Sequence, residues 1–434
     1  MTEDLSAVLT RLRDGQTSAG TEIDKSLAAI DSPACRHAFV RVYADEARAS
    51  TASASAQSPL GGLAVSIKDN FDLAGHAATA GSRALTSGPA RDSLAAARLR
   101  AAGAAFVGHT NMTEFAYSGL GLNPHFDTPR NPVTAAIDGR ERIPGGSSSG
   151  AAVSVATGAA WAALASDTGG SVRIPAALHG LVGFKSTQRL MPVEGLLPLA
   201  TTLDTAGAIT RSVRDAVLLH EILAARTVRL AGRPLSACRF GVPRGLMLDG
   251  VDATVAGAFE RALKRIAAAG ARVEDITLAP LATLPASPVI VAAEAWSWYR
   301  RLSAAQQAQV DPRVAKRVVA GREVLAADYI DRLAERLDWI AAMERAIEGF
   351  DAMLSPTVPV VAPELAPLLA SDDAYFAANG LLLRNPGLVN ALDGCALSLP
   401  CQADGELPVG LMLWARGGRD DDLLDTARRI EEVL

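Results

Sequence analysis

Apolar positions recur along this chain in short units that predict helices followed directly by strands. A helical spacing of apolar residues at 4–13 ends at Gly15, and residues 63–70 form an apolar run after two glycines. A helix followed by a strand is predicted three times, at 93–102 and 105–109, at 151–159 and 161–166, and at 254–269 and 272–274. Such alternation predicts an α/β fold with a large mixed, mostly parallel central sheet that helices cover on both faces.

Three further segments have clear patterns and a fourth does not. Residues 291–349 are mainly helical and charged, 352–355 resemble a strand, and 421–434 form a helix that begins with acidic residues. The alanine- and serine-rich stretch at 49–58 fits either a flexible linker or a surface helix, because alanine is a strong helix former. The sequence contains no internal repeat and no clear interdomain linker, so we expect a single domain.

Composition narrows the class of protein. The 434 residues are 49% hydrophobic, which supports a sizeable core, and the net charge is −5 with both signs spread along the chain. Without a basic stripe, nucleic-acid binding is not indicated, and no uncharged apolar run of membrane-spanning length occurs. Four cysteines lie apart without a C-x-x-C pair, and the N-terminus has no leader pattern, so we expect reduced thiols in a cytoplasmic protein.

Two serine-bearing glycine turns between residues 144 and 187 are the first candidates for chemistry. In one of them, Gly169-Gly170-Ser171 follows an apolar strand, and its glycines allow a substrate to approach the backbone N–H groups. Such N–H groups can form an oxyanion hole, whose loss costs about 2.7–4 kcal/mol of transition-state stabilisation. The tripeptide alone is more often an ordinary loop, so this interpretation needs a second feature.

A lysine in an apolar strand supplies that feature. Lys68 ends the run at 63–68, and burial lowers the pKa of a lysine until its neutral form can act as a base near neutral pH. A strand-end lysine paired with a carboxylate is the ordinary alternative, and Asp69 directly follows it. Together with the serine turns, Lys68 suggests a serine hydrolase whose proton acceptor is lysine.

A histidine-based hydrolase is the main rival, because Gly146-Ser147-Ser148-Ser149-Gly150 matches the G-x-S-x-G nucleophile elbow. That elbow needs a preceding strand, but residues 138–144 are polar and turn-like. It also needs a histidine late in the chain, but the histidines are His37, His76, His109, His125, His179 and His220, with none after the last. Their spacing indicates no metal site, and no Walker phosphate loop is present, so we expect neither a metal nor a cofactor.

These segments together resemble the amidase signature family of serine hydrolases. The resemblance extends from about residue 60 to the C-terminus and is densest over 144–187. The motifs occur in the family's order, and they are Gly-Gly-Ser-Ser-Ser-Gly from 145, Asp-Thr-Gly-Gly-Ser-Val-Arg from 167 and Gly-Phe-Lys-Ser-Thr from 183. The two serines that the family uses, Ser147 and Ser171 here, are separated by the family's 24 positions.

The resemblance implies the amidase signature fold and a Ser-cisSer-Lys triad. Ser171 is then the nucleophile, Ser147 the bridging serine on a cis peptide, and Lys68 the base. Backbone N–H groups of the turn form the oxyanion hole, and a second serine supports the network; these residues are Thr168, Gly169, Gly170, Ser171 and Ser148. The chain departs from the family pattern at three non-catalytic positions, namely Ser149, His179 and Ser186.

The implied organisation is one amidase domain over 1–434. It comprises an N-terminal helical segment at 1–58, a catalytic core at 60–215 and a helical region at 285–350 that we expect to border the substrate pocket. Aromatic residues that can line this pocket, or equally be ordinary core or surface residues, are Trp296, Trp298, Tyr299, Tyr329 and Phe376.

The implied function is hydrolysis of a small carboxamide with release of ammonia or an amine. The alternative is a glutaminase subunit of a tRNA-dependent amidotransferase, which works with partner subunits. An α/β-hydrolase esterase and an inactive scaffold are less favoured. A homodimer is left open, and we expect neither nucleic-acid nor membrane partners.

Overall fold

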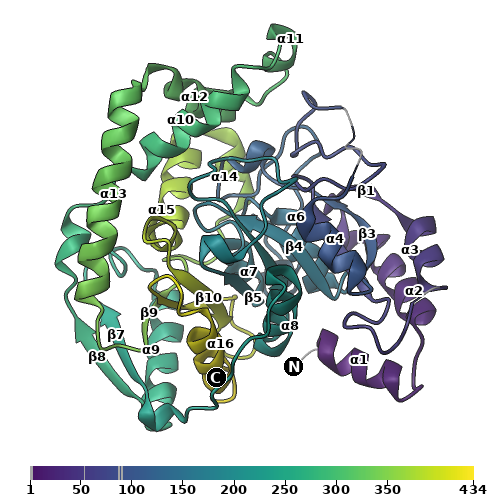
Figure 1. Ribbon diagram of the computed structural model, residues 1–434, viewed down its shortest axis with the longest axis horizontal. Helices are drawn as coiled ribbons and strands as arrows, with labels where there is room; N and C mark the ends of the chain where they lie inside the picture. Colours follow the sequence, from purple (N-terminus) through teal and green to yellow (C-terminus); the bar gives the residue numbers. More distant parts are fainter. Residues whose placement is uncertain (1–2, 53, 87, 89–90) are drawn as a thin grey trace.

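A single mixed β-sheet runs through the computed structural model, which describes residues 3–52, 54–86, 88 and 91–434 (Figure 1). In the described part of the chain the sheet has 11 strands in the order β1-β3-β2-β4-β6-β5-β10-β11-β9-β7-β8. The strands are β1 (Phe39–Val42), β2 (Ala64–Lys68), β3 (Ala105–Thr110), β4 (Ala162–Asp167), β5 (Val182–Lys185), β6 (Thr205–Thr210), β7 (Arg239–Pro243), β8 (Arg272–Ile276), β9 (Ala352–Pro356), β10 (Cys395–Pro400) and β11 (Gly410–Ala415).

The mixed sheet is confirmed, but the expected parallel majority is wrong. Four strand pairings are parallel (β2 with β3 and β4, β7 with β8 and β9), and the other six in the described sheet are antiparallel. The parallel pairs lie toward the two ends of the sheet, where helices connect the strands. Between them, β4, β6, β5, β10, β11 and β9 alternate in direction, as in the β10–β11 hairpin, which needs no helical crossover.

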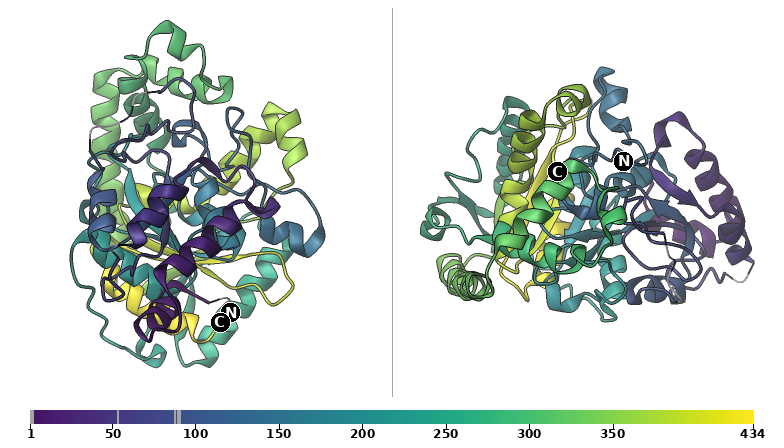
Figure 2. Two further views of the ribbon diagram at one scale, coloured as in Figure 1. Left: turned by 90° about the vertical axis from the view of Figure 1, so that its right-hand side faces the viewer. Right: turned by 90° about the horizontal axis from the view of Figure 1, so that it is seen from above.

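Helices lie on both faces of the sheet, as expected (Figures 1 and 2). They are α1 (Leu5–Arg13), α2 (Ala19–Ile30), α3 (Ala44–Thr51), α4 (Leu94–Ala101), α5 (Pro132–Asp138), α6 (Ser149–Thr157), α7 (Arg173–His179), α8 (Val213–Ala224), α9 (Ala253–Ala268), α10 (Ser287–Tyr299), α11 (Ala304–Gln307), α12 (Pro312–Val319), α13 (Ala326–Ala346), α14 (Leu365–Ala370), α15 (Asp372–Ala391) and α16 (Asp420–Glu431).

Several helices begin at a residue whose side chain caps the first turn. Asp4 accepts a hydrogen bond from the N–H of Ala7 at the start of α1, and Asp252 accepts one from Val255 at the start of α9. Helix α3 covers only the beginning of the alanine-rich stretch at 49–58, so the surface-helix interpretation holds as far as Thr51. Residue 53 of that stretch lies outside the described residues.

Apolar side chains pack against both halves of the sheet. One buried cluster surrounds β2, β3 and β4 and includes the apolar face of α1, while another surrounds β7, β9, β10 and β11 and includes α9 and α16. The strands β2 and β4 pair in parallel within the first of these clusters, so their carboxyl ends lie at the same edge of the sheet.

Among the described residues, no helix combines the length and the apolar character that crossing a bilayer requires.

Candidate active site

Lys68 is the last residue of β2, and its side chain is completely buried. Its Nζ lies 2.7 Å from Ser147 Oγ and 2.8 Å from Ser166 Oγ, and it also contacts the Ser166 carbonyl at 3.4 Å. Ser166 belongs to β4, the parallel neighbour of β2, so strand pairing places the lysine and this serine together. Asn70 donates to the same Ser166 Oγ over 3.0 Å.

Burial makes Lys68 a group that is partly neutral near pH 7, whereas an exposed lysine is charged there. Desolvation lowers the pKa of Lys68 from 10.5 to about 7, although the carboxylates of Asp167 and Asp204 act to raise it. A pKa near 7 means that a large share of the side chain is neutral at physiological pH. Lys68 can therefore accept a proton from the hydroxyl that it contacts.

Ser147 lies in a turn held close to a second loop. The peptide bond between Gly146 and Ser147 is cis, as the resemblance implies, and the Ser147 carbonyl accepts a hydrogen bond from Thr113 N–H over 3.1 Å. A Cβ at Gly146 would lie 2.5 Å from the Gly121 nitrogen, so only glycine fits there. The close packing leaves Ser147 buried, with its hydroxyl directed at Lys68.

Ser148 connects this turn to the second serine turn. Its N–H donates to the Ser171 carbonyl over 3.3 Å, and its Oγ donates to the Ser166 carbonyl over 3.4 Å. Helix α6 begins at the next residue, Ser149. No strand directly precedes this turn in the described chain, which is why the nucleophile-elbow alternative does not fit.

Ser171 follows a glycine turn between β4 and α7 and lines a cavity of about 440 Å³. Gly170 has φ +124°, and a Cβ there would lie 2.6 Å from the Pro386 ring, so the turn requires glycine. The N–H of Gly170 donates to Asp167 Oδ1 over 2.7 Å and is thus already used, which differs from its expected place in an oxyanion hole. Among the described residues, the N–H groups of Gly169 and Ser171 have no such partner.

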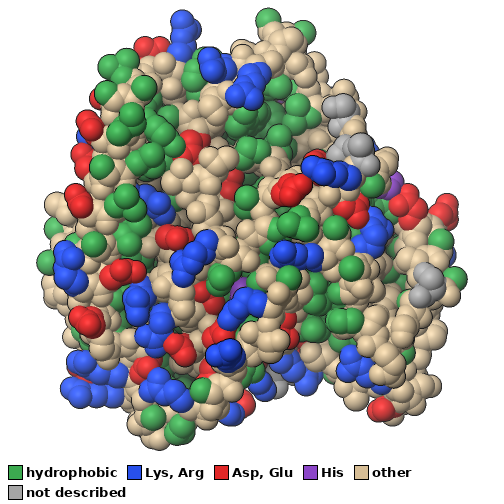
Figure 3. Space-filling model, viewed as in Figure 1, with side chains coloured by type: hydrophobic (Ala, Val, Ile, Leu, Met, Phe, Trp, Pro, Cys, Tyr) green, Lys and Arg blue, Asp and Glu red, His purple; other side chains and the backbone are tan. Residues whose placement is uncertain are grey.

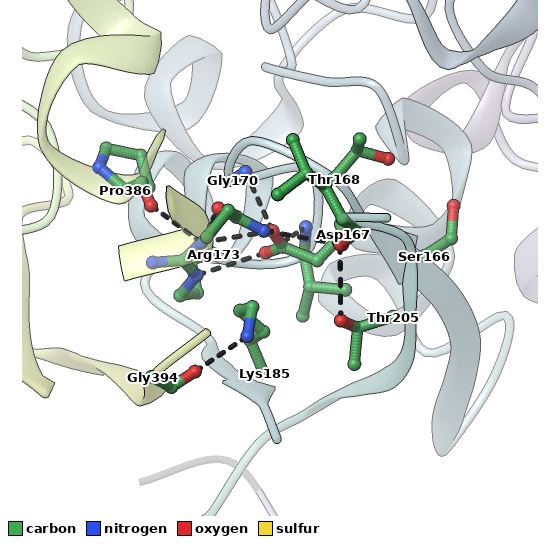
Figure 4. A network of polar contacts seen from close by, with 12 residues as sticks. Ser166, Asp167, Thr168, Gly170, Arg173, Lys185, Thr205, Pro386 and Gly394 are labelled. Atoms are coloured by element: carbon green, nitrogen blue, oxygen red, sulfur yellow. Dashed lines mark hydrogen bonds and ion pairs between the residues drawn. The ribbon is translucent and has the colours of Figure 1, made fainter. Parts of the chain in front are cut away.

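Asp167 anchors this turn from below (Figure 4). Its carboxylate accepts hydrogen bonds from Gly170 and Val172 N–H and forms two contacts of 3.0 Å with the completely buried Arg173 guanidinium. Burial alone would raise the pKa of Asp167, but the Arg173 charge and these hydrogen bonds hold it well below its usual range. Asn390 of α15 contacts both side chains and links the turn to the far wall of the cavity.

A second buried carboxyl supports the other side of the turn. Thr168 Oγ1 donates to Asp204, which also accepts from Leu199 N–H over 2.9 Å and Ala200 N–H over 3.1 Å. Burial raises the pKa of Asp204 to about 7, against the effect of these hydrogen bonds. The contact joins the Ser171 turn to the loop that forms one rim of the cavity.

The cavity wall is mostly apolar and comes partly from the region 285–350. Val291 of α10 and Arg317 of α12 contribute from this region, and Leu388 contributes from α15. The five aromatic residues considered for this role are not in the wall, which instead contains Tyr117. Trp298 and Tyr299 pack with Phe115 in a core cluster, and Tyr329 donates to Glu294.

Among the histidines, His179 has a structural role. His179 is buried, its Nδ1 contacts the Pro175 carbonyl at 2.9 Å, and burial lowers its pKa to about 4. No cluster of three potential metal ligands occurs in the described ranges. In the view of Figure 3, acidic and basic side chains are interspersed over the surface.

Sequence reasoning missed Ser166 and Asp167 as parts of the site. Both stand at the carboxyl end of an apolar strand, directly before the glycine turn, and this position is the signal that could have found them. It also missed the wall residues Arg317 and Arg384, for which the local sequence contains no comparable signal.

Comparison with known proteins identifies the family of the chain. The sequence matches the Amidase family over residues 23–424. It is 36% identical to the 2-amino-5-chloromuconic acid deaminase of Comamonas testosteroni, covering 94% of this chain and 93% of that protein. It is 33% identical to the A subunit of the glutamyl-tRNA(Gln) amidotransferase of Symbiobacterium thermophilum, covering 99% and 94%.

Solved structures agree with these relatives. A crystal structure of an amidase superimposes with a TM-score of 0.90 and 32% identity over the full length of both chains. The A subunit of the glutamyl-tRNA(Gln) amidotransferase of Thermotoga maritima gives a TM-score of 0.78 and 29% identity, covering 95% of this chain and 91% of that one. The mixed sheet covered by helices and the two serine turns thus define a hydrolase that acts on C–N amide bonds. The chain belongs to the amidase family.

Proposed function

We propose that this chain hydrolyses the C–N bond of a small carboxamide with Ser171 as nucleophile, Ser147 as proton relay and Lys68 as base. The observation that carries the proposal is the 2.7 Å contact between Lys68 Nζ and Ser147 Oγ, in a buried network beside the cavity that Ser171 lines. The membership of the amidase family supports the same reaction class.

The proposed proton path begins at the contact between Lys68 and Ser147 and continues to Ser171, as the family resemblance implies. Neutral Lys68 accepts the Ser147 proton while Ser147 accepts the Ser171 proton, and Ser171 Oγ forms a bond to the amide carbonyl carbon. The oxyanion that develops is stabilised by the N–H groups of Gly169 and Ser171, because both lack another acceptor among the described residues. The C–N bond then breaks as the relayed proton passes to the leaving nitrogen.

Water completes the reaction along the same path. The relay deprotonates a water molecule, which attacks the acyl-enzyme carbonyl and releases the carboxylic acid and Ser171. No metal or cofactor takes part in this sequence. Asp167 keeps the turn rigid through Gly170 and Val172 and does not itself transfer a proton.

Substitution of the nucleophile tests the proposal. The Ser171→Ala variant should lose turnover of every amide by more than about 10³-fold and should fail to react with a fluorophosphonate probe. EDTA should leave the wild-type activity unchanged. Chelator-sensitive activity, or full activity in the Ser171→Ala variant, would contradict the mechanism.

An ammonia-delivering subunit is the second candidate, because a relative over nearly the whole chain is the A subunit of an amidotransferase. The two candidates differ in what the purified chain does alone. Amide hydrolysis without partner subunits or ATP supports the independent amidase. Glutamine hydrolysis that appears only with partner subunits supports the alternative.

We also propose a cytoplasmic location. Four cysteines, all buried and unpaired, suit a reducing compartment such as the cytoplasm. We keep a homodimer as a proposal, and light scattering of the purified protein tests it.

A further inference from the structure

A six-residue loop, 199–204, lies between the serine turn and the helices that form part of the cavity wall. Both leucines of this loop line the same cavity as Ser171. The loop leads into β6, whose Thr205 pairs with Asp167 at the end of β4, directly before the turn. Two buried carboxyl groups hold the loop from opposite sides. Their role rests on the proposed function, because it concerns the backbone N–H groups beside Ser171.

Asp204 holds the loop to the serine turn. One of its oxygens accepts the Thr168 hydroxyl, and the other accepts the N–H groups of Leu199 and Ala200 over 2.9 and 3.1 Å. Thr168 directly precedes Gly169, whose N–H belongs to the proposed oxyanion hole. A shift of the loop would therefore move Thr168 and change the direction of that N–H, on which the strength of its hydrogen bond depends.

Glu294 of α10 holds the same loop from the other side. Its carboxylate accepts hydrogen bonds from the Thr202 N–H over 2.9 Å, from the hydroxyls of Thr201 (3.1 Å) and Thr202, and from the Tyr329 hydroxyl of α13 over 2.7 Å. These donors are neutral, and no cation pairs with Glu294 in the described part of the chain. The side chain is only 9% exposed, so loss of these bonds would leave a poorly solvated charge.

Glu294 thus connects three parts of the molecule that meet at the cavity. Helices α10 and α13 pack against each other, and Val291 of α10 lies in the cavity wall three residues before Glu294. Burial raises the pKa of Asp204 to about 7, and the charge of Glu294 adds to this effect, which shows that the two carboxyl groups interact. A contact path therefore runs from Tyr329 through the two carboxyl groups to Thr168.

We propose that Glu294 and Asp204 are positioning residues that couple the helical wall of the cavity to the oxyanion hole beside Ser171. Neither carboxyl group is among the residues that line the cavity, so both act through the loop between them. Such chains of hydrogen bonds can carry energetic coupling between sites that do not touch. A substrate that packs against α10 keeps the loop in place, and the Gly169 N–H stays directed at the developing oxyanion.

A double-mutant cycle tests the coupling with hexanamide, an uncharged amide that suits the apolar wall. Tyr329→Phe and Thr168→Val each remove one hydroxyl, at opposite ends of the contact path, and keep both carboxyl groups. Each change should lower kcat by about 5- to 30-fold and alter KM by less than about 3-fold, because the lost alignment acts on the transition state. The double variant should lose much less than the product of the two effects, since either change already releases the turn.

The matched control replaces Thr168→Val by Thr17→Val. The Thr17 hydroxyl donates over 2.6 Å to Glu22, a buried carboxylate between α1 and α2, and neither residue lines the cavity. Thr17→Val should leave kcat within about 2-fold of the wild type, and its effect should multiply with that of Tyr329→Phe. Losses in kcat that multiply for Thr168→Val as well, or an effect confined to KM, would overturn the inference.

Hydrogen–deuterium exchange separates the inference from the catalytic proposal. The amides at 168–172 should exchange at least about fivefold faster in Tyr329→Phe, although that side chain makes no hydrogen bond to the turn, and should keep their rates in Thr17→Val. Unchanged exchange in Tyr329→Phe overturns the inference. Faster exchange in this variant, together with a wild type that neither hydrolyses small amides nor reacts with a fluorophosphonate, would refute the hydrolytic mechanism alone.

Discussion

Lys68 shows how a single side chain acquires its reactivity from its surroundings. Its strand buries it completely, and its nearest polar neighbours are the hydroxyls of Ser147 and Ser166. Hydroxyl oxygens stabilise an ammonium much less than a carboxylate in contact would, so desolvation dominates. The result is a pKa of about 7 in place of 10.5.

This pKa predicts the pH dependence of the reaction. The neutral form of Lys68 is the proposed base, so kcat/KM should rise about tenfold per pH unit below about 7 and level off above it. A substrate without an ionising group should be used, so that the profile reports the free enzyme. A profile that falls with rising pH through this range would contradict the assignment of Lys68 as base.

Substitution of Ser166 should shift the same pH profile of kcat/KM in a specific direction. The Ser166→Ala variant removes an oxygen that accepts from Nζ over 2.8 Å, which disfavours the charged lysine. The rising limb should therefore move to lower pH, while Lys68→Met should abolish turnover. A merely structural role of Ser166 would lower activity without moving the limb.

At the scale of elements, the unit formed by β4, the glycine turn and α7 holds the proposed nucleophile, Ser171. Its centre is the buried pair of Asp167 and Arg173, which also contacts α15 through Asn390. A buried pair of this kind contributes little net stability when intact, but its disruption leaves an uncompensated charge. The rigidity of the turn and the stability of the fold thus depend on the same contact.

Removing the charge of Asp167 should therefore be costly. We expect Asp167→Asn to lower the free energy of unfolding by about 3–5 kcal/mol, because Arg173 stays buried without a counter-charge. Denaturant unfolding followed by circular dichroism measures this change. The matched control is Glu141→Gln, which breaks an ion pair with Arg130 whose side chains are 57% and 58% exposed, and should cost less than about 1 kcal/mol. Similar losses in both variants would refute the argument.

The elements that could be predicted from the sequence are those with a local signal. Helix α9 has a capping aspartate and a regular apolar face, and β2 and β3 follow glycines, so their positions agree with the predictions. The antiparallel centre could not be predicted, because β10 is almost entirely buried and lacks the alternation that marks a half-exposed strand. Its apolar run gives no information about the direction of its neighbours.

In the candidate site, too, some residues could be predicted from the sequence and others could not. The motifs around Ser147 and Ser171 and the lone lysine at 68 stand out locally, and the structure brings the first serine within 2.7 Å of Lys68. Ser166 takes its place through strand pairing, and Arg317 and Arg384 meet the cavity only through the packing of α12 and α15. Such contacts depend on tertiary structure and leave no trace in neighbouring residues.

At the scale of the whole molecule, the two ends of the chain meet at one place (Figures 1 and 2). Asp4 caps α1 and pairs with Arg214 of α8, and Asp215 accepts from the Leu5 N–H over 2.9 Å. Glu431 at the end of α16 accepts from the Val213 N–H over 2.8 Å. Three carboxyl groups thus converge on the first turn of α8 and join both termini to the middle of the chain.

Because these carboxyl groups lie close together, the free energy of unfolding should depend on pH through Glu431. Burial, together with the charges of Asp215 and Asp4, raises the pKa of Glu431 from 4.5 to about 7. The folded state therefore holds this proton more tightly than the unfolded state, so the contribution of Glu431 to stability is full below about pH 4.5 and is lost as pH rises toward 7. Glu431→Gln keeps an acceptor for Val213 but cannot ionise.

The variant and the wild type should have equal free energies of unfolding near pH 4.5. By pH 8 the variant should be the more stable by about 1–2 kcal/mol, less than the full shift implies because water screens the partly exposed carboxyl. Urea unfolding at several pH values measures the difference directly, and other titrating groups cancel in it. Parallel stability curves for the two proteins would mean that the pKa of Glu431 is the same in the folded and unfolded states, and would contradict the raised pKa.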